Sequence, residues 1–127
     1  MGPHVLVVDD DQVCADAIRL LLQDAEYQVS VAHHFSQALA ILEASPPPDV
    51  LIADIVMPNS VNGIALARMG RLRNPNLRVI YITGYDIPGV LREAAGPVMR
   101  KPLADDELLA AVAAELRATR PLRCCQT

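Results

Sequence analysis

Short apolar runs alternate with stretches of helical periodicity along the whole chain, and this alternation constrains the fold more than any other feature. Strands are predicted at 5–8, 27–32, 50–53, 77–82 and 97–100. Helices are predicted at 12–24, 36–42, 64–72, 86–95 and 103–119, the fourth of them weak because Pro88 and Gly89 interrupt it. Five strand–helix repeats predict an α/β fold in which right-handed crossovers build a parallel sheet with helices on both faces.

Composition narrows the classes of protein that such a chain could form. The 127 residues are 52% hydrophobic, which suits one globular domain with a core. Apolar runs fall short of the roughly 18 residues that cross a bilayer, and the start resembles no signal peptide, so we expect a cytoplasmic protein without membrane contact. Three cysteines do not make a disulfide framework. A net charge of −4 and four aromatic residues argue against direct nucleic-acid binding.

Polar side chains stand where several of the predicted strands end. Asp9 and Asp10 follow the first strand, Asp54 the third, and Thr83 and Lys101 close the fourth and fifth. Parallel strands bring their carboxyl ends to one edge of the sheet, where ligands bind in folds of this kind. These side chains are therefore expected to converge.

The chemistry of this set indicates phosphoryl transfer. Three carboxylates repel one another, and Lys101, the only lysine beside ten arginines, cannot offset them. A Mg²⁺ ion can offset this repulsion, because it binds a few carboxylates and prefers sites completed by a phosphate. A lysine and a hydroxyl are suitable donors to the other phosphoryl oxygens. Asp54 lies on the central strand, within reach of the others, and is the best candidate for a nucleophile that forms an acyl phosphate.

Four short motifs, in order and at these spacings, resemble the receiver domain of two-component response regulators. They are Asp9-Asp10, the Asp-x-x-Met-Pro segment 54–58, Thr83-Gly84 and Lys101-Pro102. The resemblance covers residues 4–119 and leaves 120–127 as a C-terminal tail. It implies a flavodoxin-like (βα)5 doubly wound fold with strand order 2-1-3-4-5, and a signalling domain rather than an enzyme, with at most self-phosphorylation and self-dephosphorylation.

The resemblance also implies roles for individual residues. Asp54 would be the phosphoacceptor, and Mg²⁺ would be held by Asp54, directly by Asp10, through a water by Asp9, and by the backbone carbonyl of Val56. Thr83 would turn toward the phosphoryl group. Lys101 would pair with a phosphoryl oxygen and precede a cis peptide bond.

The expected output is a conformational change at the face formed by the fourth strand, fourth helix and fifth strand. Implied partners are a histidine kinase or histidine phosphotransfer protein, a downstream protein, and a second copy through the face of the fourth helix, fifth strand and last helix. Val98 stands where the family has an aromatic switch residue, although Tyr81 or Tyr85 could substitute. The loop between Pro58 and Gly63 is one residue longer than the commonest form.

Two other interpretations remain open. The segment from Val5 to Val13 also fits the signature of haloacid-dehalogenase-like phosphatases, with Asp9 as nucleophile and Asp11 as general acid. That interpretation leaves the Asp54 motif unexplained. The third is a receiver-like docking module that is never phosphorylated.

Several other residues have plain structural interpretations. Asp11 and Ser36 are predicted helix N-caps, and Cys14 a small core residue on the inner side of the first helix. His33 and His34 are expected in a solvated loop. A solvated helix face is expected for Arg68, Arg71 and Arg73.

Overall fold

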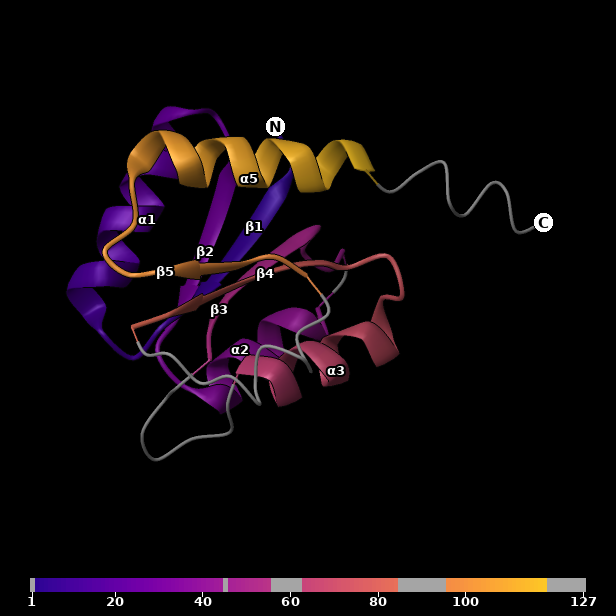
Figure 1. The fold of residues 1–127 in the computed structure, drawn as a ribbon. Coiled ribbons are helices and arrows are strands. Elements are labelled where there is room, and N and C mark those ends of the chain that lie inside the picture. The colour runs from indigo at the N-terminus through magenta and orange to yellow at the C-terminus, as the bar shows by residue number, and fades with distance from the viewer. Residues whose placement is uncertain (1, 45, 56–62, 85–95, 119–127) are drawn as a thin grey trace.

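The computed structural model describes residues 2–44, 46–55, 63–84 and 96–118, and these form a parallel sheet between two layers of helices (Figure 1). The five strands are β1 His4–Val8, β2 Gln28–Ala32, β3 Val50–Asp54, β4 Arg78–Thr83 and β5 Val98–Arg100. Their order is β2-β1-β3-β4-β5, as predicted. The described helices are α1 Gln12–Asp24, α2 Phe35–Leu42, α3 Gly63–Arg73 and α5 Asp105–Ala118. The weak helix predicted at 86–95 and the tail 120–127 lie outside the described residues.

Each central strand is buried on both faces, so its alternate side chains enter two separate cores. On one face, Leu6, Leu51 and Val79 pack with α2 and α3. On the other, Val5, Ile52 and Ile80 pack with α1 and α5. Figure 1 shows the two helix pairs on opposite sides of the sheet. Within the described ranges, no helix has the length and apolar character needed to span a membrane.

Helix α1 has the predicted start and a well-defined end. The Asp11 carboxylate accepts hydrogen bonds from the N–H groups of Val13 and Cys14, at 3.0 and 3.3 Å, which confirms the predicted N-cap. At the other end Tyr27 N–H donates to Leu22 O and Glu26 adopts a positive φ of 73°. This is a Schellman motif with glutamate at the position that glycine usually occupies.

Helix α2 begins differently from the prediction. His34, not Ser36, is the N-cap residue, and its side chain makes no capping hydrogen bond. The Ser36 hydroxyl lies 3.0 Å from His34 Nδ1, so it is inside the helix and bonded to the neighbouring ring. The predicted N-cap at Ser36 was therefore wrong.

The arginines of α3 are less uniform than a solvated face. Arg73 is exposed and pairs with Glu43 at 3.1 Å. Arg71 is half-buried, and its Nε donates to Leu77 O at 3.3 Å, tying the helix end to the segment before β4. The expectation of a solvated face was wrong for Arg71.

Candidate functional site: an acidic pocket at the carboxyl edge of the sheet

Asp9, Asp54 and Lys101 meet at the carboxyl edge of the sheet. Lys101 Nζ lies 2.9 Å from Asp9 Oδ2 and 3.1 Å from Asp54 Oδ2, so one ammonium bridges two carboxylates. The Asp9 residue is fully buried and Asp54 is 5% exposed. The predicted convergence of these three groups is confirmed.

The strand pattern explains why the three side chains meet. Val5, Val7 and then Asp9 lie on one side of the sheet, as do Val50, Ile52 and then Asp54. Met99 packs into the same core, and Lys101 follows it by two residues. All three site residues thus continue the side-chain alternation toward the α1–α5 face.

Backbone contacts fix the strand ends that carry these groups. Lys101 N–H donates to Thr83 O at 2.8 Å, which joins the ends of β4 and β5. At the start of α3, a Cβ added to Gly63 would lie 2.5 Å from the Asp54 carbonyl oxygen. Only glycine lets the helix approach the Asp54 backbone so closely. The Thr83 side chain is 2% exposed at the same edge.

The two buried carboxylates differ in proton affinity. Burial would raise the pKa of Asp9, but its contact with Lys101 and the hydrogen bond from Asp11 N–H outweigh this and lower that pKa. Burial and the neighbouring Asp9 charge raise the pKa of Asp54 to about 6, although Lys101 opposes the change. Asp9 therefore ionises first, and Lys101 cannot fully stabilise two negative charges.

Lys101 and Cys14 respond to the same charges. Burial would lower the pKa of Lys101, but its contacts with Asp9 and Asp54 outweigh that effect and raise it, so the side chain stays cationic. Burial and a hydrogen bond to Asp9 raise the pKa of the Cys14 thiol to about 12. Cys14 is therefore a neutral thiol at the border of the site, packed partly into the α1–α5 core as predicted.

The pocket fits a hard divalent cation. One carboxylate oxygen from each of Asp9, Asp10 and Asp54 lies within 4.8 Å of the other two. Among the described residues, no donor is aligned to hydrogen-bond the buried Asp9 Oδ2; Lys101 contacts it as an ion pair. Three carboxylates beside one ammonium leave excess negative charge, which such a cation would relieve. Asp10 is exposed, which leaves its carboxylate accessible from solvent.

The sequence analysis also singled out Val56, Tyr85, Tyr81 and the peptide bond after Lys101. Val56 lies outside the described residues, as does Tyr85. The Lys101–Pro102 peptide bond is cis, as the resemblance implies. Tyr81 is 1% exposed and packed in the α2–α3 core beside Val98.

The sequence analysis did not predict that His33 contacts the backbone of the acidic pocket. It is half-buried, and its Nδ1 lies 3.2 Å from the Asp9 carbonyl oxygen, so the expected solvated loop was wrong for this residue. His34 is exposed. The available signal was position, because His33 follows β2, the strand next to β1, by one residue.

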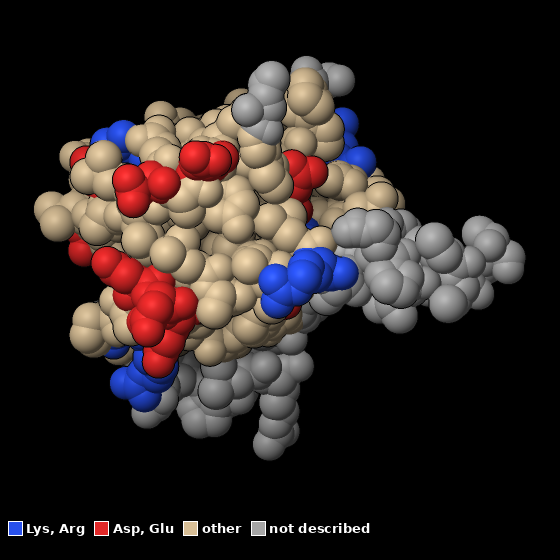
Figure 2. Space-filling model, turned by 90° about the horizontal axis from the view of Figure 1, so that it is seen from above, with Lys and Arg blue, Asp and Glu red and all other residues tan. Residues whose placement is uncertain are grey.

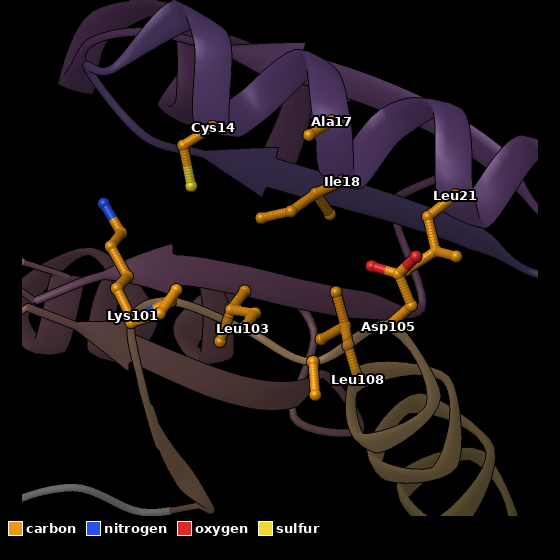
Figure 3. Close-up of a pocket in the computed structure, with 10 residues that line it drawn as sticks. Cys14, Ala17, Ile18, Leu21, Lys101, Leu103, Asp105 and Leu108 are labelled. Carbon is orange, nitrogen blue, oxygen red and sulfur yellow. The ribbon is translucent and has the colours of Figure 1, made fainter.

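Beside the pocket, a groove of about 410 Å³ runs between α1 and the segment that leads from β5 into α5. Figure 3 shows Cys14, Ile18 and Leu21 of α1 facing Lys101, Leu103 and Leu108 across it. Figure 2 looks onto this side of the molecule, where acidic side chains gather toward the end at which α5 begins. The first turn of α5 contributes Asp105, Asp106 and Glu107, all exposed.

The parallel sheet of order β2-β1-β3-β4-β5, with an acidic pocket at its carboxyl edge, narrows the class of protein, and comparison with known proteins identifies the family. The family model described as "Response regulator receiver domain" matches residues 5–113. The chain therefore belongs to the response regulator receiver family. Response regulator MprA of Mycobacterium bovis is 35% identical over 126 residues, which is 95% of this chain and 54% of MprA. The chain thus spans about half the length of the curated relatives it matches.

Solved structures agree with this family. A CheY-like receiver domain protein from Methanospirillum hungatei superposes with a TM-score of 0.82 at 25% identity, covering 91% of this chain and 94% of that one. The receiver domain of Francisella response regulator 1452 gives a TM-score of 0.77 at 29% identity, covering 90% and 96%.

The family membership favours neither of the two alternatives. Asp11 would be the general acid of a phosphatase, but its carboxylate caps α1 and accepts two backbone hydrogen bonds. A docking module that is never phosphorylated does not require buried acids at this edge. Asp9, Asp54 and Lys101 are all present there, which argues against that interpretation.

Proposed function

We propose that Asp54 accepts a phosphoryl group from a phosphohistidine of a histidine kinase or phosphotransfer protein, in a Mg²⁺-dependent reaction. The bridge from Lys101 to Asp9 and Asp54, with Asp10 beside it, is the observation that carries this proposal. An Asp54 oxygen would attack phosphorus as the bond from phosphorus to the histidine nitrogen breaks. The products are an acyl phosphate and a histidine that regains a proton from solvent.

The other site residues prepare Asp54 for this step. Asp9, Asp10, Asp54 and the Val56 carbonyl would hold Mg²⁺, which supplies positive charge for the phosphoryl oxygens. A cation at this position favours ionised Asp54, whose pKa in its absence is raised to about 6. Lys101 Nζ contacts one carboxylate oxygen of Asp9 and one of Asp54, so it is suited to hold an oxygen of a phosphoryl group on Asp54. The Thr83 hydroxyl is a second donor at this edge.

Signal output would follow from those new contacts. Phosphorylation adds charge and acceptor oxygens, and Lys101 would exchange carboxylate contacts for phosphoryl ones. The Lys101 N–H donates a hydrogen bond to Thr83 O, so a movement of the end of β4 or of β5 would displace the end of the other strand. This supports a conformational change at β4, β5 and the helix that the sequence predicts between them. A downstream protein, or a second copy bound through that helix, β5 and α5, would read the change.

We also propose a cytoplasmic location and a domain that extends over residues 4–119. The surface beside the site suits a protein partner, since Val13 and Leu20 on α1 are 80% and 58% exposed. Both belong to α1, whose Cys14, Ile18 and Leu21 line the groove. Exposed apolar side chains around a polar site are typical of protein docking surfaces.

Intact-mass spectrometry after incubation with acetyl phosphate, with and without Mg²⁺, tests the proposed reaction. The expected result is one added phosphoryl group that requires Mg²⁺ and is lost in Asp54→Asn. An adduct that survives Asp54→Asn but is lost in Asp9→Asn would instead support the phosphatase interpretation. Failure to form any adduct, with Mg²⁺ binding absent as well, would support the docking module. The same spectra, followed over time, measure self-dephosphorylation.

A further inference from the structure

His33 contacts the backbone of the acidic pocket from the neighbouring strand. It stands one residue after β2, and its Nδ1 lies 3.2 Å from the carbonyl oxygen of Asp9. Its own N–H donates to Gln37 Oε1 at 2.9 Å, so a side chain of α2 holds the loop that carries the ring. The ring is half-buried. Its position is thus set from two sides.

The direction of the bond between the ring and Asp9 follows from chemistry. A carbonyl oxygen can only accept, so Nδ1 must carry the hydrogen. In a neutral ring this fixes the tautomer with hydrogen on Nδ1 and leaves Nε2 unprotonated.

With this bond, each polar part of Asp9 has a defined contact. Its N–H donates to Ala32 O at 3.1 Å, and its Oδ1 accepts from Asp11 N–H at 3.0 Å. Its Oδ2 meets Lys101, and its carbonyl accepts from His33. The Asp9 carbonyl belongs to the peptide group that joins Asp9 to Asp10, so the ring holds the plane of that peptide.

We propose that His33 is a positioning residue for the cation site: by holding the Asp9–Asp10 peptide, it keeps the exposed Asp10 carboxylate beside those of Asp9 and Asp54. The inference rests on the proposed Mg²⁺-dependent function. Groups that orient the ligands of a metal, without touching it, typically change its affinity by ten- to a hundredfold when removed. Asp10 depends most on such support, because its side chain is exposed whereas Asp9 is buried.

A set of substitutions separates this role from simple packing. In His33→Asn the amide nitrogen can occupy the place of Nδ1, whereas in His33→Gln it reaches the place of Nε2 instead. His33→Ala removes the ring. The matched control is His34→Ala, because His34 is the adjacent, exposed ring and its Nδ1 lies 3.0 Å from the Ser36 hydroxyl rather than against the pocket.

Calorimetric titration of each full-length variant with MgCl₂ is the decisive measurement. We expect the dissociation constant to rise about tenfold in His33→Ala and His33→Gln, and to stay within about twofold of the native value in His33→Asn and His34→Ala. Thermal unfolding in Mg²⁺-free buffer accompanies it. A purely structural role would lower the melting temperature of His33→Ala and leave the Mg²⁺ affinity unchanged, which would overturn the proposal.

NMR of the imidazole nitrogens, at mildly alkaline pH and without Mg²⁺, tests the bond itself. Hydrogen on Nδ1 of His33 is expected, and hydrogen on Nε2 would overturn the proposal even if the variants bind weakly. The native chain separates the two hypotheses. If it neither binds Mg²⁺ nor takes up phosphate, the proposed function has failed. If it does both, and His33→Ala binds Mg²⁺ equally well, only the role of His33 has failed.

Discussion

The two faces of the sheet are packed differently, although the same five strands supply both. Among the described residues, the core under α2 and α3 has 14 buried members and three partly buried ones. The core under α1 and α5 has 11 buried members and ten partly buried ones, and it borders the groove. On the α2–α3 side, Gly70 is so close to its neighbours that an added Cβ would lie 2.8 Å from Leu77 Cδ2.

The acidic pocket opens on the looser face. Asp9, Asp54 and Lys101 continue the side-chain alternation toward α1 and α5, and Lys101 also lines the groove. Closely packed interiors transmit and resist displacement, whereas partly filled ones tolerate side-chain movement. The difference suggests that the α2–α3 face holds the sheet while the α1–α5 face accommodates change around the site.

Matched leucine truncations should show the largest difference between the faces. Leu66→Ala removes a fully buried side chain from α3 and should lower the free energy of unfolding by about 3–4 kcal/mol. Leu21→Ala removes a partly buried side chain that lines the groove, and should cost only about 1 kcal/mol because the site is already open to water. Urea unfolding monitored by circular dichroism measures both. Equal losses would contradict the comparison.

The two carboxylates of the pocket should respond to pH in opposite directions. The pKa of Asp54 is raised to about 6 in the folded chain from its ordinary value of 3.8, so the native chain loses stability as pH rises between these values. Asp54→Asn should therefore stabilise the Mg²⁺-free protein by about 1–2 kcal/mol at neutral pH, and by nothing once pH falls below 3.8.

Asp9 supplies the control for that experiment. Its folded pKa is lowered, so its contribution to stability is present above 3.8 and is lost as pH falls through the folded value. Asp9→Asn should then destabilise the protein at neutral pH. Denaturant titrations at several pH values compare the variants. If Asp9→Asn stabilised the protein, Asp9 rather than Asp54 would be the carboxylate whose ionisation destabilises the fold.

Substitutions that enlarge a side chain should change the stability least, and the sign of the change should differ between the two faces of the sheet. Gly70→Ala gains helix propensity of about 1 kcal/mol, but the crowding against Leu77 and Leu42 should outweigh it and leave a net loss of about 1 kcal/mol. Ala17→Leu extends an apolar side chain along the groove wall and should be neutral or stabilise by about 0.5 kcal/mol. Melting temperatures measured by calorimetry test the pair. Destabilisation by Ala17→Leu would mean that the groove is not free to be filled.

The sequence predicted the sheet and the convergence of Asp9, Asp54 and Lys101 because both depend on local signals. A buried strand reads as an apolar run, and a polar residue directly after it marks the sheet edge, as at Asp54 and Lys101. The bounds of the described strands and helices differ from the prediction by two residues at most. The order of the strands came from the family resemblance, since alternation alone does not specify it.

The inner face of α1 and the difference between the two buried acids could not be predicted, because both depend on which groups approach one another in space. In α1 the apolar residues Val13 and Leu20 follow helical spacing yet are exposed, whereas Ala15, Ile18 and Leu22 are buried. Both sets are apolar at the same period, so the pattern identifies a helix but not its inner face. Likewise, Asp9 and Asp54 look alike in sequence. Both contact Lys101. In the fold, the hydrogen bond from Asp11 N–H helps to lower the pKa of Asp9, whereas burial and the neighbouring Asp9 charge raise the pKa of Asp54.

The lysine that bridges these acids is also the only primary amine on a side chain in the molecule. An amine-directed label would thus mark a single side chain within these 127 residues, without any engineered substitution. Because Lys101 is cationic and partly shielded while it holds both carboxylates, we expect its labelling to be slow in that arrangement and to change when those contacts change. The pocket therefore contains its own chemical reporter of occupancy, which can be followed by peptide mass mapping in the unmodified protein.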